Sequence, residues 1–159
     1  MALVFVVDDQ ATNRILLSKL AYSIESDIQV AAFDDPCSAL AECTRRTPDL
    51  IISDYKMPGM SGAEFICRLR ANSRCHDIPV MVLTAYNDRE IRMEALEAGA
   101  TDFLLNPVDN AEFVSRARNL LHLHTQQRLL ENRADGLAYE LEESERHREE
   151  AARNDREVL

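Results

Sequence analysis

The sequence predicts a doubly wound α/β domain with a five-stranded parallel sheet and a long helical extension. Apolar runs recur at regular intervals up to about residue 105, and a segment with helical spacing follows each of them. The runs are continuous and do not alternate with polar residues, which is typical of strands that helices cover on both faces. At 159 residues the chain is long enough for one such domain and an appendage, since one core takes ~100 to 150 residues.

The five strands are predicted where β-branched and aromatic residues cluster. They are Leu3 to Val7, Ile28 to Phe33, Leu50 to Ser53, Val80 to Leu83 and Asp102 to Leu105. Helical spacing predicts helices over Thr12 to Tyr22, Pro36 to Arg45, Gly62 to Ala71 and Arg89 to Ala98. Asp35 before Pro36 is a typical helix start, and Gly99 is a typical helix stop.

A fifth helix is predicted to begin near Asp109 or Asn110 and to continue as a linker. A short heptad pattern places Leu123, Leu130 and Leu137 at one seam position and Gln127, Ala134 and Leu141 at the other. Gly136 lies within this pattern and lowers helix propensity by roughly 1 kcal/mol relative to Ala, so an isolated helix pair is expected to be marginal. We therefore expect a domain at residues 1–122 and a coiled-coil linker at residues 123–159, which ends before an effector domain.

Composition argues against several kinds of partner. The chain has 18 Lys and Arg against 28 Asp and Glu, a net charge of −10, which disfavours nucleic acid and anionic lipid. No apolar run approaches the ~20 residues of a membrane span, and the start lacks the basic region of a signal peptide. We expect a cytoplasmic protein. Its four cysteines show no metal or redox spacing, and most are expected to be buried or half-buried free thiols.

Polar side chains follow four of the predicted strands at the edge where parallel strands end. Asp8 and Asp9 follow the first strand, Asp54 the third, Thr84 the fourth and Asn106 the fifth. Ligands of doubly wound sheets bind at this edge. Three carboxylates placed together repel one another unless a cation binds or one takes up a proton, and hard oxygen ligands suit Mg²⁺. Asp8 and Asp9 alone fit a strand-ending turn that caps the next helix, and the combination with Asp54 favours a metal.

A loop rich in Pro and Gly follows Asp54 and can direct a backbone carbonyl toward a cation. It runs from Met57 through Pro58, Gly59, Met60 and Ser61 to Gly62. Thr84 can donate a hydrogen bond to an oxyanion added to Asp54. The sequence therefore predicts a pocket for a phosphoryl group.

Together these residues resemble the receiver domain of two-component response regulators, which has a flavodoxin-like fold. The resemblance covers about residues 1 to 122. The matching motifs are Asp8-Asp9, Asp54, the Met57 to Gly62 loop, Thr84-Ala85 and the stretch from Gly99 to Val108.

The resemblance implies a role for each matching residue. Asp54 would be the phosphoacceptor, and Mg²⁺ would be bound by Asp8, Asp9, Asp54 and the backbone carbonyl of Met57. Thr84 would bond the phosphoryl oxygen, and Thr84 and Phe103 would form the conformational switch. The phosphoryl donor would be a sensor histidine kinase or a phosphotransfer protein.

One position departs from the family pattern. Receivers normally have Lys before the Pro of the last strand, and here that residue is Asn106. A neutral amide can donate a hydrogen bond but cannot offset the phosphoryl charge, so Asn106 bears on the strength of coupling between phosphorylation and the Thr84 and Phe103 switch. Lys56 could partly substitute, although a solvated Lys is the better expectation. Bulky Lys56 and Tyr86 also predict slow hydrolysis of the acyl phosphate, because in this family the residues at these positions influence its rate.

The heptad pattern of the tail predicts how phosphorylation is passed on to an effector. Phosphorylation is expected to change the pairing or register of a parallel homodimer that pairs through Leu123, Leu130, Leu137 and Leu141. The alternative is that the tail is a solvated single helix. The connector resembles that of regulators whose receiver precedes an HD-GYP cyclic-di-GMP phosphodiesterase domain, and a diguanylate cyclase or another effector is also compatible.

Two other functions compete with a phosphorylated receiver. A degenerate receiver that acts only as a dimerisation or interaction scaffold differs by Asn106 alone. A small Mg²⁺-dependent phosphatase would need a cap over the site, and no insertion is long enough to form one. His122 and His124 are too far apart around a helix to share a metal, which favours solvent or packing roles.

Overall fold

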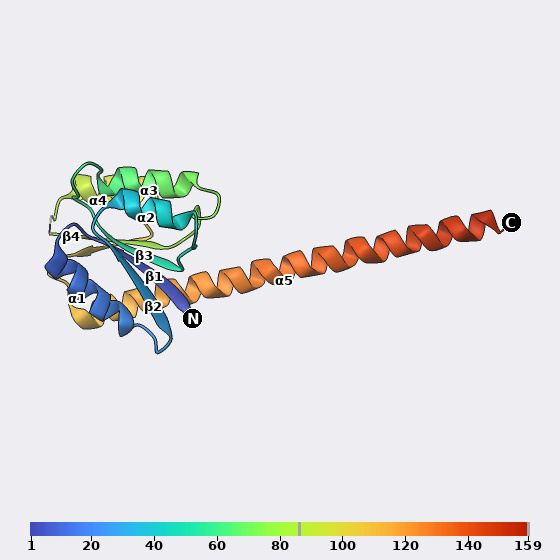
Figure 1. The fold of residues 1–159 in the computed structure, drawn as a ribbon, viewed down its shortest axis with the longest axis horizontal. Coiled ribbons are helices and arrows are strands. Elements are labelled where there is room, and N and C mark those ends of the chain that lie inside the picture. The colour runs from blue at the N-terminus through green and yellow to red at the C-terminus, as the bar shows by residue number, and fades with distance from the viewer. Residues whose placement is uncertain (86, 159) are drawn as a thin grey trace. The chain divides into compact units, whose positions relative to one another are not determined.

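The computed structural model describes residues 1–85 and 87–158. All strand pairs are parallel, and the sheet has the order β2-β1-β3-β4-β5 (Figure 1). The strands are β1 (Ala2–Val7), β2 (Ile28–Phe33), β3 (Leu50–Asp54), β4 (Val80–Thr84) and β5 (Asp102–Leu105). The helices are α1 (Ala11–Tyr22), α2 (Pro36–Cys43), α3 (Gly62–Ala71), α4 (Arg89–Ala98) and α5 (Asn110–Glu157). The predicted doubly wound five-stranded sheet is confirmed.

Two hydrophobic clusters cover the two faces of the sheet. Figure 1 shows α2, α3 and α4 on one side of the sheet, and α1 with the first turns of α5 on the other. Phe5 and Val7 point into the cluster formed with α2, α3 and α4, whereas Val4 and Val6 point into the cluster formed with α1 and α5. Successive side chains of a strand point to opposite faces. This explains why the central strands are continuously apolar in sequence.

The strand order reverses at β1, which lies between β2 and β3. The chain passes first to β2 on one side of β1 and then to β3 on the other, so a crevice opens at the carboxyl ends of β1 and β3. Val7 pairs with Ser53, which brings the next residues, Asp8 and Asp54, to the same level of the sheet. Asp54 in turn pairs with Leu83, the residue before Thr84.

Local signals explain most helix boundaries. The Asp35 carboxylate accepts a hydrogen bond from the Ser38 N–H at 2.9 Å, and Pro36 begins α2. Gly99 ends α4 with a φ of 110°, in the left-handed region that glycine adopts without strain. The expected end of the second helix at Arg45 is wrong, because α2 ends at Cys43 and the Thr44 hydroxyl donates to the Ala41 carbonyl at 2.7 Å.

The chain divides into two units, Met1–His124 and a second that begins at Thr125. Helix α5 contributes to both and continues through Gly136 without interruption. The part of α5 that belongs to the first unit buries Phe113, Ala117 and Leu121. A helix needs both length and apolar character to cross a membrane, and no helix among the described residues has both.

The four cysteines divide evenly between interior and surface. Cys43 and Cys75 are buried, but Cys37 and Cys67 are exposed, so the expectation that most would be buried or half-buried is wrong. The exposed pair lies on the solvent sides of α2 and α3, where hydrophobicity alone does not identify the outward face. Burial raises the pKa of the Cys43 thiol to about 12, which makes it a poor nucleophile.

Candidate functional site

Three carboxylates meet at the crevice between β1 and β3. One carboxylate oxygen from each of Asp8, Asp9 and Asp54 lies within 4.8 Å of the others. Asp8 is buried, Asp54 is half-buried and Asp9 is exposed. The structure therefore brings together the three side chains that the sequence placed at this edge, with one side open to solvent.

Burial and neighbouring negative charge raise the pKa of two of these carboxylates, Asp54 and Asp8. Burial, followed by the charges of Asp8 and Asp9, raises the pKa of Asp54 to about 6, although the Tyr55 N–H donates to its Oδ1 at 2.7 Å and opposes the shift. Burial also raises the pKa of Asp8, against a 2.8 Å hydrogen bond from the Gln10 N–H. A divalent cation would relieve both effects. This set of hard oxygen donors fits Mg²⁺.

The turn from β1 into α1 is fixed by contacts of Asp8. Its N–H donates to the Phe33 carbonyl on β2 at 3.1 Å, and its own carbonyl accepts from Nη1 of Arg14 at 2.9 Å. Sequence reasoning missed Arg14. The only signal was its position six residues after Asp8, early in the following helix.

The loop after Asp54 depends on close backbone contacts. The Gly62 N–H donates to the Tyr55 carbonyl at 2.6 Å, and a Cβ at Gly62 would lie 2.8 Å from the Tyr55 Cα. Gly59 has a φ of 80°. Met57 lies within this loop with its side chain buried. The two glycines thus allow the tight return of the chain to α3.

Thr84 and Asn106 lie next to each other at the carboxyl ends of β4 and β5. Thr84 is buried, and its carbonyl accepts from the Asn106 N–H at 2.8 Å. Asn106 is half-buried and Lys56 is exposed. Tyr86, which was expected to hinder hydrolysis together with Lys56, lies outside the described residues.

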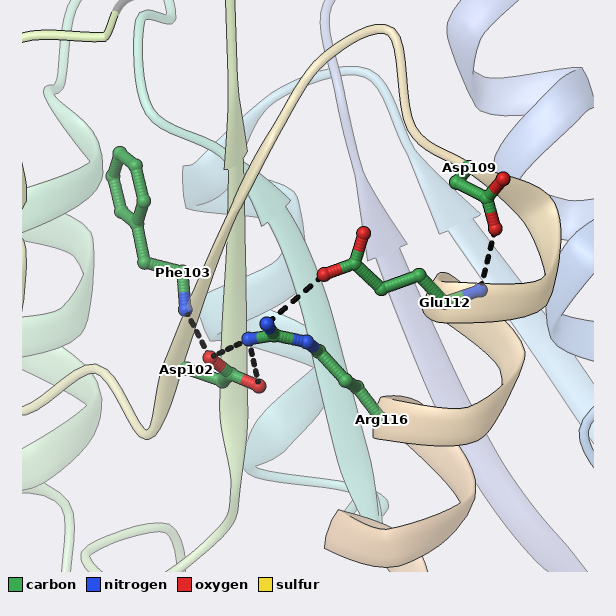
Figure 2. A network of polar contacts seen from close by, with 5 residues as sticks. All are labelled: Asp102, Phe103, Asp109, Glu112 and Arg116. Carbon is green, nitrogen blue, oxygen red and sulfur yellow. Dashed lines mark hydrogen bonds and ion pairs between the residues drawn. The ribbon is translucent and has the colours of Figure 1, made fainter.

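Phe103 on β5 contacts two helices through charged residues. The guanidinium carbon of Arg92 on α4 lies 5.4 Å from the Phe103 ring centroid. Figure 2 shows that the Phe103 N–H donates to Asp102 Oδ1, at 2.8 Å, and that Arg116 of α5 binds the same carboxylate, with Nη1 3.0 Å from Oδ1. Nη2 of Arg116 also pairs with Glu112 at 2.9 Å. These contacts join β5 to the first turns of α5.

This fold and acidic site define a class of protein. A protein-family model described as "Response regulator receiver domain" matches residues 4–118 of the sequence. The chain therefore belongs to the receiver-domain family of response regulators.

Two curated relatives differ in how much of the chain they match. The cyclic di-GMP phosphodiesterase response regulator RpfG of Xanthomonas campestris is 39% identical over 155 residues, which cover 94% of this chain and 41% of RpfG. The response regulator PleD of Caulobacter vibrioides is 38% identical over 123 residues, which cover 75% of this chain and 26% of PleD. The chain thus spans less than half the length of either relative. The match to RpfG necessarily extends beyond His124.

Among solved structures, the chemotaxis protein CheY4 of Vibrio cholerae is similar to the first unit. The TM-score is 0.65 at 31% identity, and the match covers 80% of this chain and 98% of CheY4. The match therefore includes nearly all of CheY4 and most, but not all, of this chain.

Proposed function

We propose that this chain accepts a phosphoryl group on Asp54, from a sensor histidine kinase or a phosphotransfer protein, and signals through α5 to an output domain. The observation that carries this proposal is the group of three carboxylate oxygens within 4.8 Å of one another, with Asp54 at the end of β3. Membership of the receiver family supports the same chemistry.

Asp8, Asp9, Asp54 and the Met57 carbonyl would hold the Mg²⁺ ion. When bound, Mg²⁺ supplies positive charge that offsets the carboxylates and the charge on the phosphoryl oxygens. Asp8 is buried and Asp9 is exposed, so a phosphodonor would approach the site from the side of Asp9.

Asp54 would attack the phosphorus in line. A bond forms between its carboxylate oxygen and phosphorus while the bond from phosphorus to the donor's imidazole nitrogen breaks, and the electron pair leaves with the imidazole. The Thr84 hydroxyl would donate to a phosphoryl oxygen, and the Asn106 amide would donate a second, uncharged hydrogen bond. Since the pKa of Asp54 is raised to about 6, the attacking carboxylate is mostly ionised at neutral pH.

Signalling would start at Thr84 and Phe103. A change at Phe103 would be transmitted to α5, because the same Asp102 carboxylate accepts from the Phe103 N–H and from Arg116. In the second unit Leu130, Leu137 and Leu141 are exposed by 66%, 56% and 65%, as is Leu123 at the end of the first unit by 62%. Their heptad spacing supports a parallel homodimer formed by two copies of this helix.

The alignment with RpfG supports the identity of the output. It continues into the tail, whereas PleD matches only about as much of the chain as one receiver. A cyclic-di-GMP phosphodiesterase is therefore the effector that we propose for the whole protein. A degenerate scaffold is the rival function, since Asn106 lacks the charge of the usual Lys.

The test is incubation with acetyl phosphate and MgCl₂, followed by intact mass. Wild type is expected to gain about 80 Da, one phosphoryl group. Asp54→Ala should gain nothing, and Asp135→Ala, which removes an exposed carboxylate from α5, should react like wild type. If beryllofluoride also fails to bind the wild type, phosphoacceptance is excluded and the scaffold is favoured, with Asn106→Lys as the variant expected to restore it.

Dimerisation is tested by sedimentation with and without beryllofluoride. We expect beryllofluoride to shift the wild type toward a dimer and Leu130→Glu to remain monomeric, because a charge at the seam opposes pairing. Asn132→Glu, at an exposed position on the outward side of the same helix, is the control. A wild type that stays monomeric at high concentration with beryllofluoride bound contradicts the dimer.

A further inference from the structure

We propose that Arg14 positions the acidic corner of the site, formed by Asp8 and Asp9, so that it can bind Mg²⁺. This inference rests on the proposed metal binding at Asp8, Asp9 and Asp54. Arg14 belongs to α1, and its Nη1 donates to the main-chain carbonyl of Asp8 at 2.9 Å. The guanidinium is half-buried. It is a cation that contacts the Asp8 end of the site from α1.

The atom that Arg14 holds explains how it acts on Asp9. The Asp8 carbonyl and the Asp9 nitrogen belong to one planar peptide group, so fixing the carbonyl fixes the plane from which Asp9 departs. Asp9 is exposed, and nothing in its burial would hold it in place. The contact with Arg14 therefore orients Asp9, the exposed one of the two ligands that follow β1, toward Asp54.

Two further contacts of Asp8 complete a three-way restraint. Its N–H donates to Phe33 on β2 at 3.1 Å, and its carboxylate accepts from the Gln10 N–H at 2.8 Å. The bond from Arg14 restrains the remaining polar group, the carbonyl, from the side of α1. Groups that orient metal ligands from outside the coordination sphere typically change metal affinity about 10- to 100-fold.

Because Arg14 is positively charged, the direction in which its removal changes Mg²⁺ affinity tests the proposal. A nearby positive charge repels Mg²⁺, so if Arg14 acted only through its charge, its removal would strengthen Mg²⁺ binding. If it acts by holding the corner, its removal weakens binding. The two possibilities predict shifts of the Mg²⁺ dissociation constant in opposite directions.

Arg118 offers a matched control. Its Nε donates to the Ile24 carbonyl at 2.9 Å, another half-buried bond from an arginine to a main-chain carbonyl. Arg118→Met removes the same charge and the same kind of bond, but at the turn between α1 and β2. Its effect on Mg²⁺ binding measures what the loss of such a contact does elsewhere in the domain.

The experiment is calorimetric titration of the full chain with MgCl₂, for wild type, Arg14→Met, Arg14→Lys and Arg118→Met. Arg14→Met is expected to bind Mg²⁺ about 10-fold more weakly than the wild type. The affinity of Arg14→Lys should lie between these two, because Lys keeps a donor and the charge. Arg118→Met should bind Mg²⁺ as tightly as the wild type. Amide exchange of Gln10, whose N–H donates to the Asp8 carboxylate, should be faster without metal in Arg14→Met alone. Urea denaturation without Mg²⁺ verifies that each variant is folded.

Unchanged or tighter binding by Arg14→Met overturns the proposal while the proposed metal site stands. If Arg14→Met does not fold, Arg14→Lys decides, and an unchanged dissociation constant then overturns it. Equal weakening by Arg118→Met also overturns it, because the effect would not be specific to the corner. If the wild type binds no Mg²⁺, the proposed metal site fails, and the role of Arg14 fails with it.

Discussion

Ionisation of Asp54 opposes folding when no metal is bound. The pKa of this carboxyl is raised from 3.8 to about 6, chiefly by burial and then by the charge of Asp8. A group with a raised folded-state pKa contributes stability that is fully present below pH 3.8 and is lost as the pH rises through about 6. Asp54 is therefore least favourable to the fold at neutral pH, where its chemistry requires the carboxylate.

Asp54→Asn should raise the free energy of unfolding at neutral pH. We expect a gain of about 1 to 2 kcal/mol in EDTA, discounted for partial exposure of the side chain, and a gain near zero around pH 4. Urea denaturation at the two pH values measures the difference. Equal gains at both would show that ionisation is not the cause. Added Mg²⁺ should reduce the gain at neutral pH, because it stabilises only the wild-type site.

Gly62 is required by a backbone contact. A Cβ there would lie 2.8 Å from the Tyr55 Cα, and backbone cannot rotate away as a side chain can. Gly62→Ala should lower the free energy of unfolding by about 1 to 3 kcal/mol. It should also weaken phosphorylation, because the loop follows directly on Asp54. Thermal denaturation and the acetyl phosphate assay measure the two effects, and an unchanged melting temperature would contradict the steric argument.

At the scale of elements, Arg116 joins β5 to α5 with little effect on stability. Arg116 and Asp102 are partly exposed, by 43% and 25%, and exposed ion pairs contribute about 0 to 1 kcal/mol. We expect Arg116→Ala to be phosphorylated normally. Beryllofluoride should change amide exchange in the first turns of α5 less than it does in wild type.

A surface pair on another helix is the control for that experiment. Arg68 and Glu64 form an i,i+4 pair on α3 at 3.0 Å. Arg68→Ala should leave the response of α5 to beryllofluoride unchanged. A full response in Arg116→Ala would show that the contact with Asp102 does not carry the signal.

The stability of the helix in the tail of α5 is lowered by a glycine, which has a low helix propensity. Gly136 is helical, and a Cβ there would have nothing within 4 Å. Gly136→Ala should therefore stabilise this helix by about 1 kcal/mol. Far-UV circular dichroism should show a higher melting temperature for the tail, with the transition of the α/β unit unchanged. A loss of helicity would mean that Gly136 has a contact that the isolated chain lacks.

At the scale of the whole molecule, the α/β unit should fold without the tail. Among the described residues, neither core cluster contains a buried side chain beyond Leu121, so truncation after His124 removes no core packing. We expect a melting temperature within a few degrees of wild type and an unchanged phosphoryl adduct. Thermal denaturation and intact mass measure both, and failure to fold would show that the tail contributes to the stability of the unit.

The sequence by itself determined the order of the elements and the edge of the sheet where the carboxylates lie. Continuous apolar runs, the Asp35-Pro36 start and the Gly99 stop are local signals, because they depend on solvation and backbone conformation within a few residues. The same local patterns failed for Cys37 and Cys67, whose exposure depends on which helix face meets the sheet.

Only the tertiary structure decided the electrostatics and support of the site. The raised pKa of Asp54 arises from burial and from Asp8, which directly follows another strand, β1. The contacts of Arg14 with the Asp8 carbonyl and of Arg116 with Asp102 depend on how α1 and α5 pack against the strand ends. The physical reason is that burial and charge act through space, between groups that only the packed sheet and helices bring within a few ångströms.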